Sequence, residues 1–364
     1  MNKETKKMII DAILTPFSYI YGAVVEVRNR LFNVGLLKQT KFDVPVICVG
    51  NITVGGTGKT PHVEYLIEKL CTRYKIGVLS RGYKRVTKGF VLANEILSPK
   101  DLGDEPYQMY RKYGNMITLA VCEDRVKGIK EMLKIDPTIT LFLLDDAYQN
   151  RYVLPKVNIA LVDYNRPPFR DRLLPLGRLR EPLCGLLRSD IVVVTKCPSD
   201  IKPINFREMQ NGLDLYPAND LHFSEFRYAD PVPVFALRNP RLHSLSLLTQ
   251  RDSVLAVTGI AQPKPFVRYI RAYQPNVRVM HFDDHHYFTR KDFQYIMDYF
   301  KKMPGEQKYI LTTEKDSVRI LNNPYFPPEL REYIYYIPIK VEFLQYGEKS
   351  KDFIANVIKL IEKK

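Results

Sequence analysis

Residues 46–61 read VICVGNITVGGTGKTP. A β-branched apolar run leads into a glycine-rich loop, and the loop ends in Gly58, Lys59 and Thr60. Apolar residues then recur at the spacing of one helix face. These residues are Val63, Leu66, Ile67 and Leu70. The stretch therefore predicts a strand, a phosphate-binding loop and a helix in succession.

The loop has the chemistry of a nucleotide site. Successive backbone N–H groups at the positive end of a helix can cradle phosphates. We expect these groups to come from Thr53, Val54, Gly55, Gly56, Thr57 and Gly58. Lys59 would reach the β- and γ-phosphates, and the Thr60 hydroxyl would ligate Mg²⁺. The strict pattern G-x-x-x-x-G-K-[ST] has glycine where this chain has Thr53, so a glycine-rich turn without a ligand is the alternative.

Two acids follow another apolar run. Thr138–Leu144 is a candidate strand, and Asp145 and Asp146 come directly after it. A phosphate loop needs a carboxylate at the end of a neighbouring strand to hold the metal. We therefore expect a metal-site element here, and a pair of solvated loop acids is the alternative.

The sequence favours ATP over GTP. GTPases read guanine with an Asn/Thr-Lys-x-Asp loop after a strand, and the matching stretch here is Thr195-Lys196-Cys197-Pro198. Pro198 stands where the aspartate would be, so no carboxylate is available for the guanine amino edge.

Further apolar runs alternate with helical stretches, which predicts parallel sheets covered on both faces. We expect an N-terminal helical, membrane-associated segment over 1–42, a P-loop nucleotide-binding and catalytic domain over 43–218, a short β hinge over 219–236 and a smaller C-terminal α/β domain over 237–364. The predicted fold class is P-loop NTPase-like, with two α/β/α domains and mainly parallel sheets. The expected strands are 44–49, 76–80, 116–121, 139–144, 158–162, 191–195, 254–258, 277–282, 309–312 and 334–339, with a helix over 291–302.

Three segments could supply a base or bind phosphate. Asp104 starts a predicted helix, where an aspartate is either a cap or a functional acid. His285 and His286 follow a strand of the second domain and are either loop histidines or metal ligands. The arginines of residues 170–182 could clamp phosphates or form a solvated face.

Charge and the N-terminal segment point to an anionic partner. The chain has 364 residues, 45% of them hydrophobic, and a net charge of +15. Met8–Val25 is mostly apolar but contains Asp11 and Pro16, so it is a poor spanning helix. Lys3, Lys6 and Lys7 precede it, and Arg28 and Arg30 follow it. It could lie in an anionic membrane interface or be buried against the core.

Five cysteines without a C-x-x-C pair fit free thiols in a reducing compartment.

Nine segments in order along the chain carry a family resemblance. They are VGNITVGGTGKTP (49–61), SRGY (80–83), GDEP (103–106), DDAYQN (145–150), LLPLGRLREP (173–182), VVVTK (192–196), TGIAQP (258–263), FDDHHYF (282–288) and TTEKD (312–316). On these segments the chain resembles the tetraacyldisaccharide 4′-kinases, the lipid A 4′-kinases of Gram-negative bacteria.

The resemblance implies an activity and a place in the cell. The family transfers the γ-phosphate of ATP, with Mg²⁺, to the 4′-hydroxyl of a tetra-acylated glucosamine disaccharide 1-phosphate in lipopolysaccharide synthesis. It works at the cytoplasmic face of the inner membrane, as a peripheral or monotopic protein with a membrane-facing N-terminal helix. The expected partners are the lipid substrate and an anionic membrane surface, with no nucleic acid and no obligate protein partner.

The resemblance also implies roles for residues. Asp104 would be the base for the sugar hydroxyl, and His285 would pair with it from the second domain. Asp145, Asp146 and Glu181 would supply carboxylates at or around the metal, and Asp146 would also belong to the catalytic set with Lys59. Gln149 and Arg180 would line the nucleotide cleft. The family commonly has Asp-Asp-Gly-Leu-Gln-His where this chain has DDAYQN, so Asn150 replaces a histidine.

Two other functions remain open at this point. A P-loop GTPase or metallochaperone explains Lys59, Thr60 and Asp145, but not Pro198 or the apolar N-terminus. A nucleotide-gated nucleic-acid-binding module fits the charge, but the basic residues are spread over the chain and form no known nucleic-acid motif.

Overall fold

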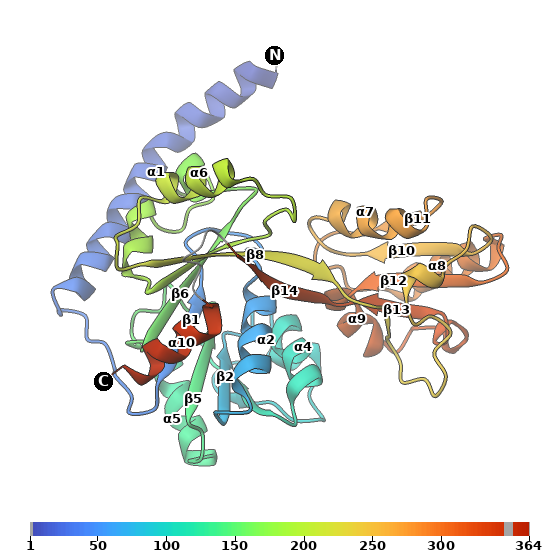
Figure 1. Cartoon of the computed structure of the whole chain (residues 1–364), viewed down its shortest axis with the longest axis horizontal. Helices are drawn as coiled ribbons and strands as arrows, with labels where there is room; N and C mark the ends of the chain where they lie inside the picture. Colours follow the sequence, from blue (N-terminus) through green and yellow to red (C-terminus); the bar gives the residue numbers. More distant parts are fainter. Residues whose placement is uncertain (1–2, 346–351, 364) are drawn as a thin grey trace.

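The protein has a large and a small lobe, as the computed structural model of residues 3–345 and 352–363 shows (Figure 1). A nine-stranded sheet forms the large lobe, and a five-stranded sheet forms the small one. Both sheets are mainly parallel and carry helices, so the predicted fold class is confirmed.

The large sheet has the order β14-β8-β7-β6-β1-β5-β2-β4-β3, with β14 and β3 as antiparallel edges. The inner strands pair in parallel. The strands are β1 (Val46–Gly50), β2 (Ile76–Ser80), β3 (Val91–Leu92), β4 (Ile117–Val121), β5 (Leu141–Asp145), β6 (Val157–Asp163), β7 (Ile191–Thr195), β8 (Asp220–Tyr228) and β14 (Ile339–Leu344). Every residue of β1, β2, β5, β6 and β7 is buried, as expected for runs covered on both faces.

Helices cover both faces of this sheet. One face packs against α2 (Lys59–Leu70), α4 (Asp104–Tyr113) and α10 (Phe353–Glu362). The other packs against α5 (Arg125–Ile135) and α6 (Pro203–Leu213). Shorter elements of this lobe are α3 (Pro99–Leu102), η1 (Pro168–Arg170) and η2 (Leu183–Arg188).

The small sheet has the order β11-β10-β12-β13-β9, and only its β9 edge is antiparallel. Its strands are β9 (Val232–Pro233), β10 (Ser253–Thr258), β11 (Arg278–His281), β12 (Lys308–Thr313) and β13 (Ile334–Ile337). The helix α7 (Lys264–Tyr273) packs on one face, and α8 (Arg290–Lys302) and α9 (Glu314–Leu321) pack on the other. Two short turns complete the lobe, η3 (Leu245–Leu247) and η4 (Pro328–Leu330).

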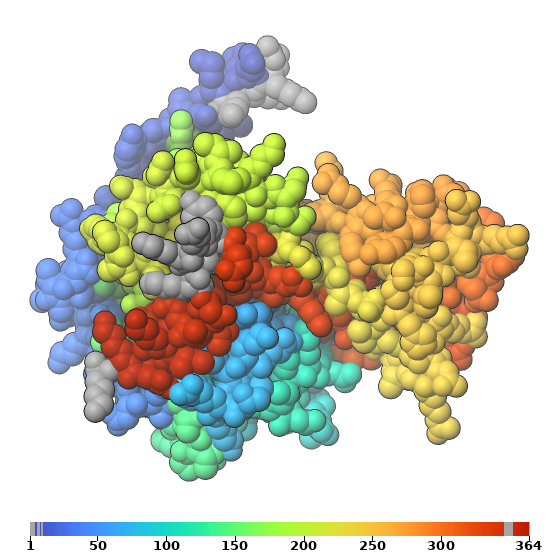
Figure 2. All heavy atoms as spheres, in the orientation of Figure 1, coloured from blue at the N-terminus to red at the C-terminus, as the bar shows by residue number. Residues whose placement is uncertain are grey.

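After the small lobe, the chain returns to the large lobe. The expected C-terminal domain over 237–364 therefore ends too late, because its last residues belong to the large lobe. Strand β14 pairs antiparallel with β8, from Ile339 opposite Tyr228 to Leu344 opposite Phe223. Buried apolar side chains of α10 then join the core that α2 helps to form. Figure 2 shows this red segment against the blue surface of the large lobe. The expected strand over 334–339 is accordingly two strands, which divide at Pro338.

Strands β8 and β14 form the connection between the lobes (Figure 1). The expected hinge over 219–236 is therefore partly a strand of the large sheet, since β8 also pairs with β7. Just beyond the last paired residues of β8 and β14, the N–H of Ala229 donates to the carbonyl of Pro338 at 2.9 Å.

The long N-terminal helix α1 (Lys3–Asn33) lies along the large lobe and projects beyond it (Figure 1). Its segment Ile10–Asn33 is long and apolar enough to cross a membrane, and the most apolar 18-residue window in it has a mean hydropathy of 1.3 and is only 6% buried. The interpretation as a helix buried against the core is therefore wrong. The side chains of Lys3, Lys6 and Lys7 lie outside the described part of the chain.

Candidate active site

The loop between β1 and α2 has the backbone that its glycines allow. Gly58 adopts φ +89° next to the ring of Phe226, and a Cβ at this position would overlap that ring. Gly55 also has a positive φ, +112°. Thr53 lies in an antiparallel bridge with Leu179, where a side chain is accommodated. The departure from the strict glycine pattern therefore leaves the loop intact.

A strand beside the loop holds it in place. The Thr195 hydroxyl, at the end of β7, donates to the Thr57 carbonyl at 2.8 Å. Lys196 donates to the Gly56 carbonyl and lies 2.7 Å from Asp163 Oδ2. Thr195 and Lys196, the pair that we compared with a guanine-reading loop, thus hold the phosphate loop by hydrogen bonds to its carbonyls.

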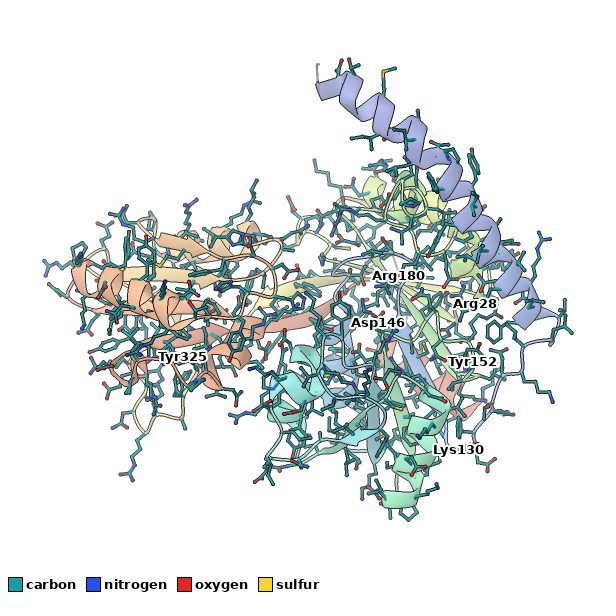
Figure 3. The ribbon with its side chains drawn as sticks, turned by 180° about the vertical axis from the view of Figure 1, so that it is seen from behind. Arg28, Lys130, Asp146, Tyr152, Arg180 and Tyr325 are labelled. Atoms are coloured by element: carbon teal, nitrogen blue, oxygen red, sulfur yellow. The ribbon has the colours of Figure 1, made fainter. Side chains whose placement is uncertain are left out.

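Lys59, at the first position of α2, faces the acids at the end of β5. Its Nζ lies 3.5 Å from Asp146 Oδ1, and Thr60 beside it is buried. Asp146 adopts φ +48° and also lies 3.5 Å from the Arg180 guanidinium. The structure thus brings together residues from three of the predicted segments, and Figure 3 shows two of them, Asp146 and Arg180, side by side.

Asp145 is buried and carries an unpaired oxygen. The Ser80 hydroxyl donates to Oδ2 at 3.0 Å, and Oδ1 has no hydrogen-bond partner. Burial raises the pKa of Asp145 to about 7, with Glu105 and Asp146 adding to the effect. A buried carboxylate oxygen without a donor beside further acids is an environment suited to a hard cation.

The residues around this position fit Mg²⁺. No group of three or more His, Cys, Asp and Glu side chains forms a metal cage within residues 3–345 and 352–363. Mg²⁺ is usually held by one or two carboxylates together with substrate phosphates and water, so no cage is needed. Thr60 and Asp145 carry oxygens of the kind that Mg²⁺ prefers, and Asp146 follows Asp145 in the chain.

Glu181 is placed differently from the expected metal carboxylate. Arg188 binds both of its oxygens, NH1 to Oε2 at 2.6 Å and NH2 to Oε1 at 2.8 Å. Gln149 and Asn29 donate to the same carboxylate at 3.0 and 3.2 Å. Because donors of the protein occupy both oxygens, the geometry favours a structural role. No role for Arg188 was predicted from the sequence, because this residue lies outside the quoted motifs.

Asp104 and His285 meet across the two lobes. Asp104 is the first residue of α4, and His285 adopts φ +64° in the loop after β11. His285 Nδ1 lies 3.1 Å from Asp104 Oδ2. Two residues 181 positions apart are therefore in hydrogen-bond contact. His286 instead bonds Asp292 at 2.9 Å and stacks on Phe282, which makes it a structural residue of the small lobe.

Arg319, one turn after Asp316 on α9, also binds Asp104. Its NH2 and Nε donate to Asp104 Oδ2 at 2.6 and 3.0 Å, and its NH1 donates to buried Asp316 at 3.0 Å. Burial raises the pKa of Asp104, but the bonds from His285 and Arg319 outweigh it and hold the pKa at about 2. The motif TTEKD lies just before Arg319 in the sequence, and this proximity was the available signal for it.

A second cluster of contacts links α2, α4 and α9. Lys112 of α4 binds Glu64 of α2 at 2.6 Å and Glu314 of α9 at 3.2 Å. Gln108 donates to the other oxygen of Glu64 at 2.8 Å. The helix that follows the phosphate loop, the helix that starts at Asp104 and the helix that carries Arg319 therefore share one charged cluster.

A cavity of about 540 Å³ connects the Asp104–His285 pair with Asp145, Asp146 and Arg180, and Lys59 and Thr60 are not part of its lining. Its lining consists mainly of charged, aromatic and polar residues from both lobes and from α1. They are Tyr21, Arg28, Ser80, Arg81, Tyr83, Asp104, Glu105, Pro106, Glu123, Arg125, Asp145, Asp146, Gln149, Asn150, Tyr152, Leu174, Arg180 and His285. Predicted site residues from four separate motifs, GDEP, DDAYQN, LLPLGRLREP and FDDHHYF, thus line one cavity.

The helix α1 contributes side chains that sequence reasoning missed. The Tyr21 hydroxyl donates to the Arg180 carbonyl at 2.9 Å, and Arg28 donates to the Gln149 carbonyl at 3.0 Å. Gln149 in turn donates to the Asn51 carbonyl before the phosphate loop at 2.7 Å. An apolar segment with scattered polar residues gave no signal that these two side chains face the site.

The phosphate loop places Lys59 beside the acids at the end of β5, and a carboxylate–imidazole pair lines one cavity with those acids. Together these features define the class of P-loop phosphotransferases. The chain belongs to the tetraacyldisaccharide-1-P 4′-kinase family, whose family model matches residues 10–359. The expected family is confirmed, and the GTPase or metallochaperone alternative is not favoured.

Similar proteins agree over nearly the whole chain. The chain is 50% identical to the tetraacyldisaccharide 4′-kinase of Bacteroides thetaiotaomicron over 339 residues, which are 91% of this chain and 89% of the relative. It is 41% identical to that of Porphyromonas gingivalis over 98% of both. The crystal structure of the "apo" form of LpxK from Aquifex aeolicus in complex with ATP matches with a TM-score of 0.72 and 29% identity over 97% of this chain and 98% of that one.

Proposed function

We propose that this chain transfers the γ-phosphate of ATP to the 4′-hydroxyl of a tetra-acylated glucosamine disaccharide 1-phosphate in lipid A synthesis. The family of the chain and its ATP-bound structural relative support a kinase that uses ATP. The observation that carries the proposal is the contact of Asp104 with His285 in the cavity that Asp145 and Asp146 also line.

ATP would be held by the loop and its helix. The backbone N–H groups from Thr53 to Gly58 would cradle the triphosphate, and Lys59 would neutralise the β- and γ-phosphates. The Lys59 ammonium lies 3.5 Å from Asp146 Oδ1, at the end of the phosphate loop. Gln149 and Arg180 would line the same cleft.

Mg²⁺ would be held by Thr60 and Asp145, with Asp146 next to them. The unpaired Oδ1 of Asp145 supports this assignment. The bound cation would neutralise charge on the phosphate oxygens. Glu181 would instead orient Gln149, because it accepts a hydrogen bond from that side chain at 3.0 Å.

Asp104 would accept the proton of the attacking hydroxyl. Its described bonds with His285 and Arg319 all end on Oδ2, which leaves Oδ1 for the hydroxyl. A carboxylate with a pKa of about 2 is ionised at neutral pH and is a weak base. Such a base suits phosphoryl transfer, where the loose transition state requires positioning more than early deprotonation.

The helix α1 would dock the protein on the membrane. Large apolar side chains form a stripe along it with spacings of three and four residues. The exposed members are Ile10, Ile13, Phe17, Ile20, Val24 and Val27. The opposite side is bonded to the large lobe, since Ser18 donates to the Leu173 carbonyl at 2.9 Å and Gly22 leaves room for the Leu173 side chain.

This attachment favours a helix that lies in the interface. From Ser18 onward, α1 is bonded to the lobe that carries the site. The free part, residues 3–17, would be about 22 Å long, whereas the hydrocarbon core is about 30 Å thick. We therefore propose a monotopic protein on the cytoplasmic face of the inner membrane, with its positive charge toward anionic lipid. The acyl chains of the substrate would then remain in the leaflet while the sugar enters the cavity.

The test is phosphate transfer from γ-labelled ATP to a tetra-acylated disaccharide 1-phosphate in detergent micelles. We expect labelled lipid with the phosphate on the 4′ position, and none from Lys59→Met. Nucleotide hydrolysis that prefers GTP and labels no lipid would contradict the proposal and restore the GTPase alternative.

A further inference from the structure

A lysine of the small lobe contacts the far nitrogen of the imidazole that faces Asp104. Lys315, the second residue of α9, places Nζ 3.0 Å from His285 Nε2. The same ammonium lies 3.8 Å from Glu105 Oε1. His285 therefore lies between a carboxylate on its Nδ1 side and an ammonium on its Nε2 side.

The ammonium restricts the protons on the ring. An ammonium group carries only donors, so its contact with Nε2 needs a lone pair there. A neutral imidazole without a proton on Nε2 carries it on Nδ1. That proton points to Asp104 Oδ2, which is 3.1 Å away and can accept it.

The other protonation states of the ring conflict with its neighbours. A proton on Nε2 alone would set two donors against each other at Lys315 and a lone pair against the Asp104 carboxylate. An imidazolium would also place two positive charges 3.0 Å apart. Arg319 NH2 lies 3.1 Å from Nδ1, but Asp104 already accepts from this nitrogen at 2.6 Å.

The backbone fixes the ring where these contacts meet. The N–H of His285 donates to the Gly259 carbonyl at 3.2 Å, and the Gly259 N–H donates to Asp316 at 2.9 Å. Asp316 also binds Arg319, so the first turn of α9 both anchors the loop through Asp316 and supplies the adjacent Lys315. The groups that contact His285 are Asp104 of α4, Lys315 and Arg319 of α9, and Tyr83 after β2, and Glu105 of α4 faces Lys315.

We propose that Lys315 is a positioning residue that keeps the ring proton of His285 on Nδ1, so that His285 donates to Asp104. Asp104 then presents Oδ1 to the acceptor, and His285 takes no part as a free acid. The sequence motif TTEKD supplies this lysine. The inference rests on the role proposed above for Asp104.

The test observes the ring directly. In protein labelled with ¹⁵N histidine, long-range proton–nitrogen spectra report which ring nitrogen carries the proton, and His285→Gln assigns the signal among the six histidines. We expect a proton on Nδ1 alone in the wild type near neutral pH. Lys315→Met should yield signals with a proton on Nε2, whereas Lys315→Arg should restore the wild-type pattern.

A nearby lysine provides the matched control. Lys100 lies 4.7 Å from the ring centre of Tyr287, two residues after His285, so Lys100→Met should leave the His285 signals unchanged. We also expect Lys315→Met to lower kcat about tenfold, less than the ~10²–10⁴-fold effect typical of losing a general base, with the KM for ATP unchanged.

Two results would overturn the inference: a proton on Nε2 of His285 in the wild type, or an unchanged His285 spectrum in Lys315→Met. Failure of the proposed function is a separate outcome. If the wild type labels no lipid while the spectra behave as expected, the positioning by Lys315 holds and the assigned reaction is wrong.

Discussion

Arg319 of the small lobe donates two hydrogen bonds to Oδ2 of Asp104 in the large lobe, from NH2 at 2.6 Å and from Nε at 3.0 Å. The proposed base is thus oriented by a lobe that carries no part of the phosphate loop. The third guanidinium nitrogen binds Asp316, which is buried in the small lobe. Any movement of the lobes on β8 and β14 would change the orientation of the base.

Replacing Arg319 should change the pH dependence of kcat. In the wild type, bonds from His285 and Arg319 outweigh burial and hold the pKa of Asp104 at about 2, so Asp104 stays ionised through the assay range. In Arg319→Gln the effect of burial is less opposed, and the pKa of Asp104 rises. The acid limb of kcat should therefore move to higher pH. Profiles that superimpose for folded wild type and variant would show that Arg319 does not set this ionisation.

The metal assignment can be tested by Mg²⁺ titration. Asp145→Asn should raise the Mg²⁺ concentration for half-maximal rate by about tenfold or more, because it replaces a carboxylate ligand. Glu181→Gln should leave that concentration near the wild-type value, since Arg188, Gln149 and Asn29 already occupy its oxygens. A large shift in Glu181→Gln and none in Asp145→Asn would reverse the two assignments.

The buried His62 makes the fold sensitive to acid. Its Nδ1 bonds the Gly58 carbonyl at 2.7 Å and its Nε2 bonds Ser224 at 3.0 Å, and burial lowers its pKa to about 4. Between about pH 6.5 and pH 4, His62 binds a proton in the unfolded chain but not in the folded chain. The free energy of unfolding should therefore fall as pH drops from about 6.5 to 4, by at most roughly 3 kcal/mol from this residue.

Urea unfolding of the wild type and His62→Gln at several pH values isolates this contribution. Other groups titrate in both proteins, so the difference between the two pH slopes belongs to His62. Equal slopes would mean that the pKa of His62 is the same in the folded and the unfolded chain.

The apolar stripe of α1 should control membrane binding. Each such side chain that leaves water contributes roughly 1.5–3 kcal/mol, so the triple variant Ile13→Glu, Ile20→Glu, Val24→Glu should lower the partition coefficient by more than about 100-fold. Flotation with neutral phosphatidylcholine vesicles in about 0.5 M salt removes the general attraction of a +15 chain for anionic lipid. Ile96→Glu is the control, because Ile96 is 93% exposed outside α1. Equal binding of the triple variant and this control would show that α1 is not the docking element.

Local signals were sufficient for much of the fold and the site. A buried parallel strand is a continuous apolar run, so β2 and β7 were predicted at their observed bounds. The glycine loop and Asp145 have chemistry that short motifs express. Strand β14 and helix α10 were assigned to the wrong lobe, because pairing with β8 depends on a long-range contact that a local pattern does not encode.

The groups around the base were harder to predict. Arg319 reaches Asp104 only because α9 packs against α4 across the lobes, whereas Lys315 reaches His285 within the small lobe, where α9 and the loop after β11 meet. Tyr21 and Arg28 face the cavity because α1 lies along the large lobe. The resemblance implied the pairing of Asp104 with His285 but gave no information on the cations that orient it.

Asp104→Asn provides the most direct test of the central claim that this carboxylate is the base. The measurement is the rate of lipid phosphorylation together with the affinity for ATP, in wild type and variant. Loss of a general base predicts a kcat lower by ~10²–10⁴-fold with ATP affinity nearly unchanged. A variant that keeps its kcat, or one that loses only ATP affinity, would contradict the account.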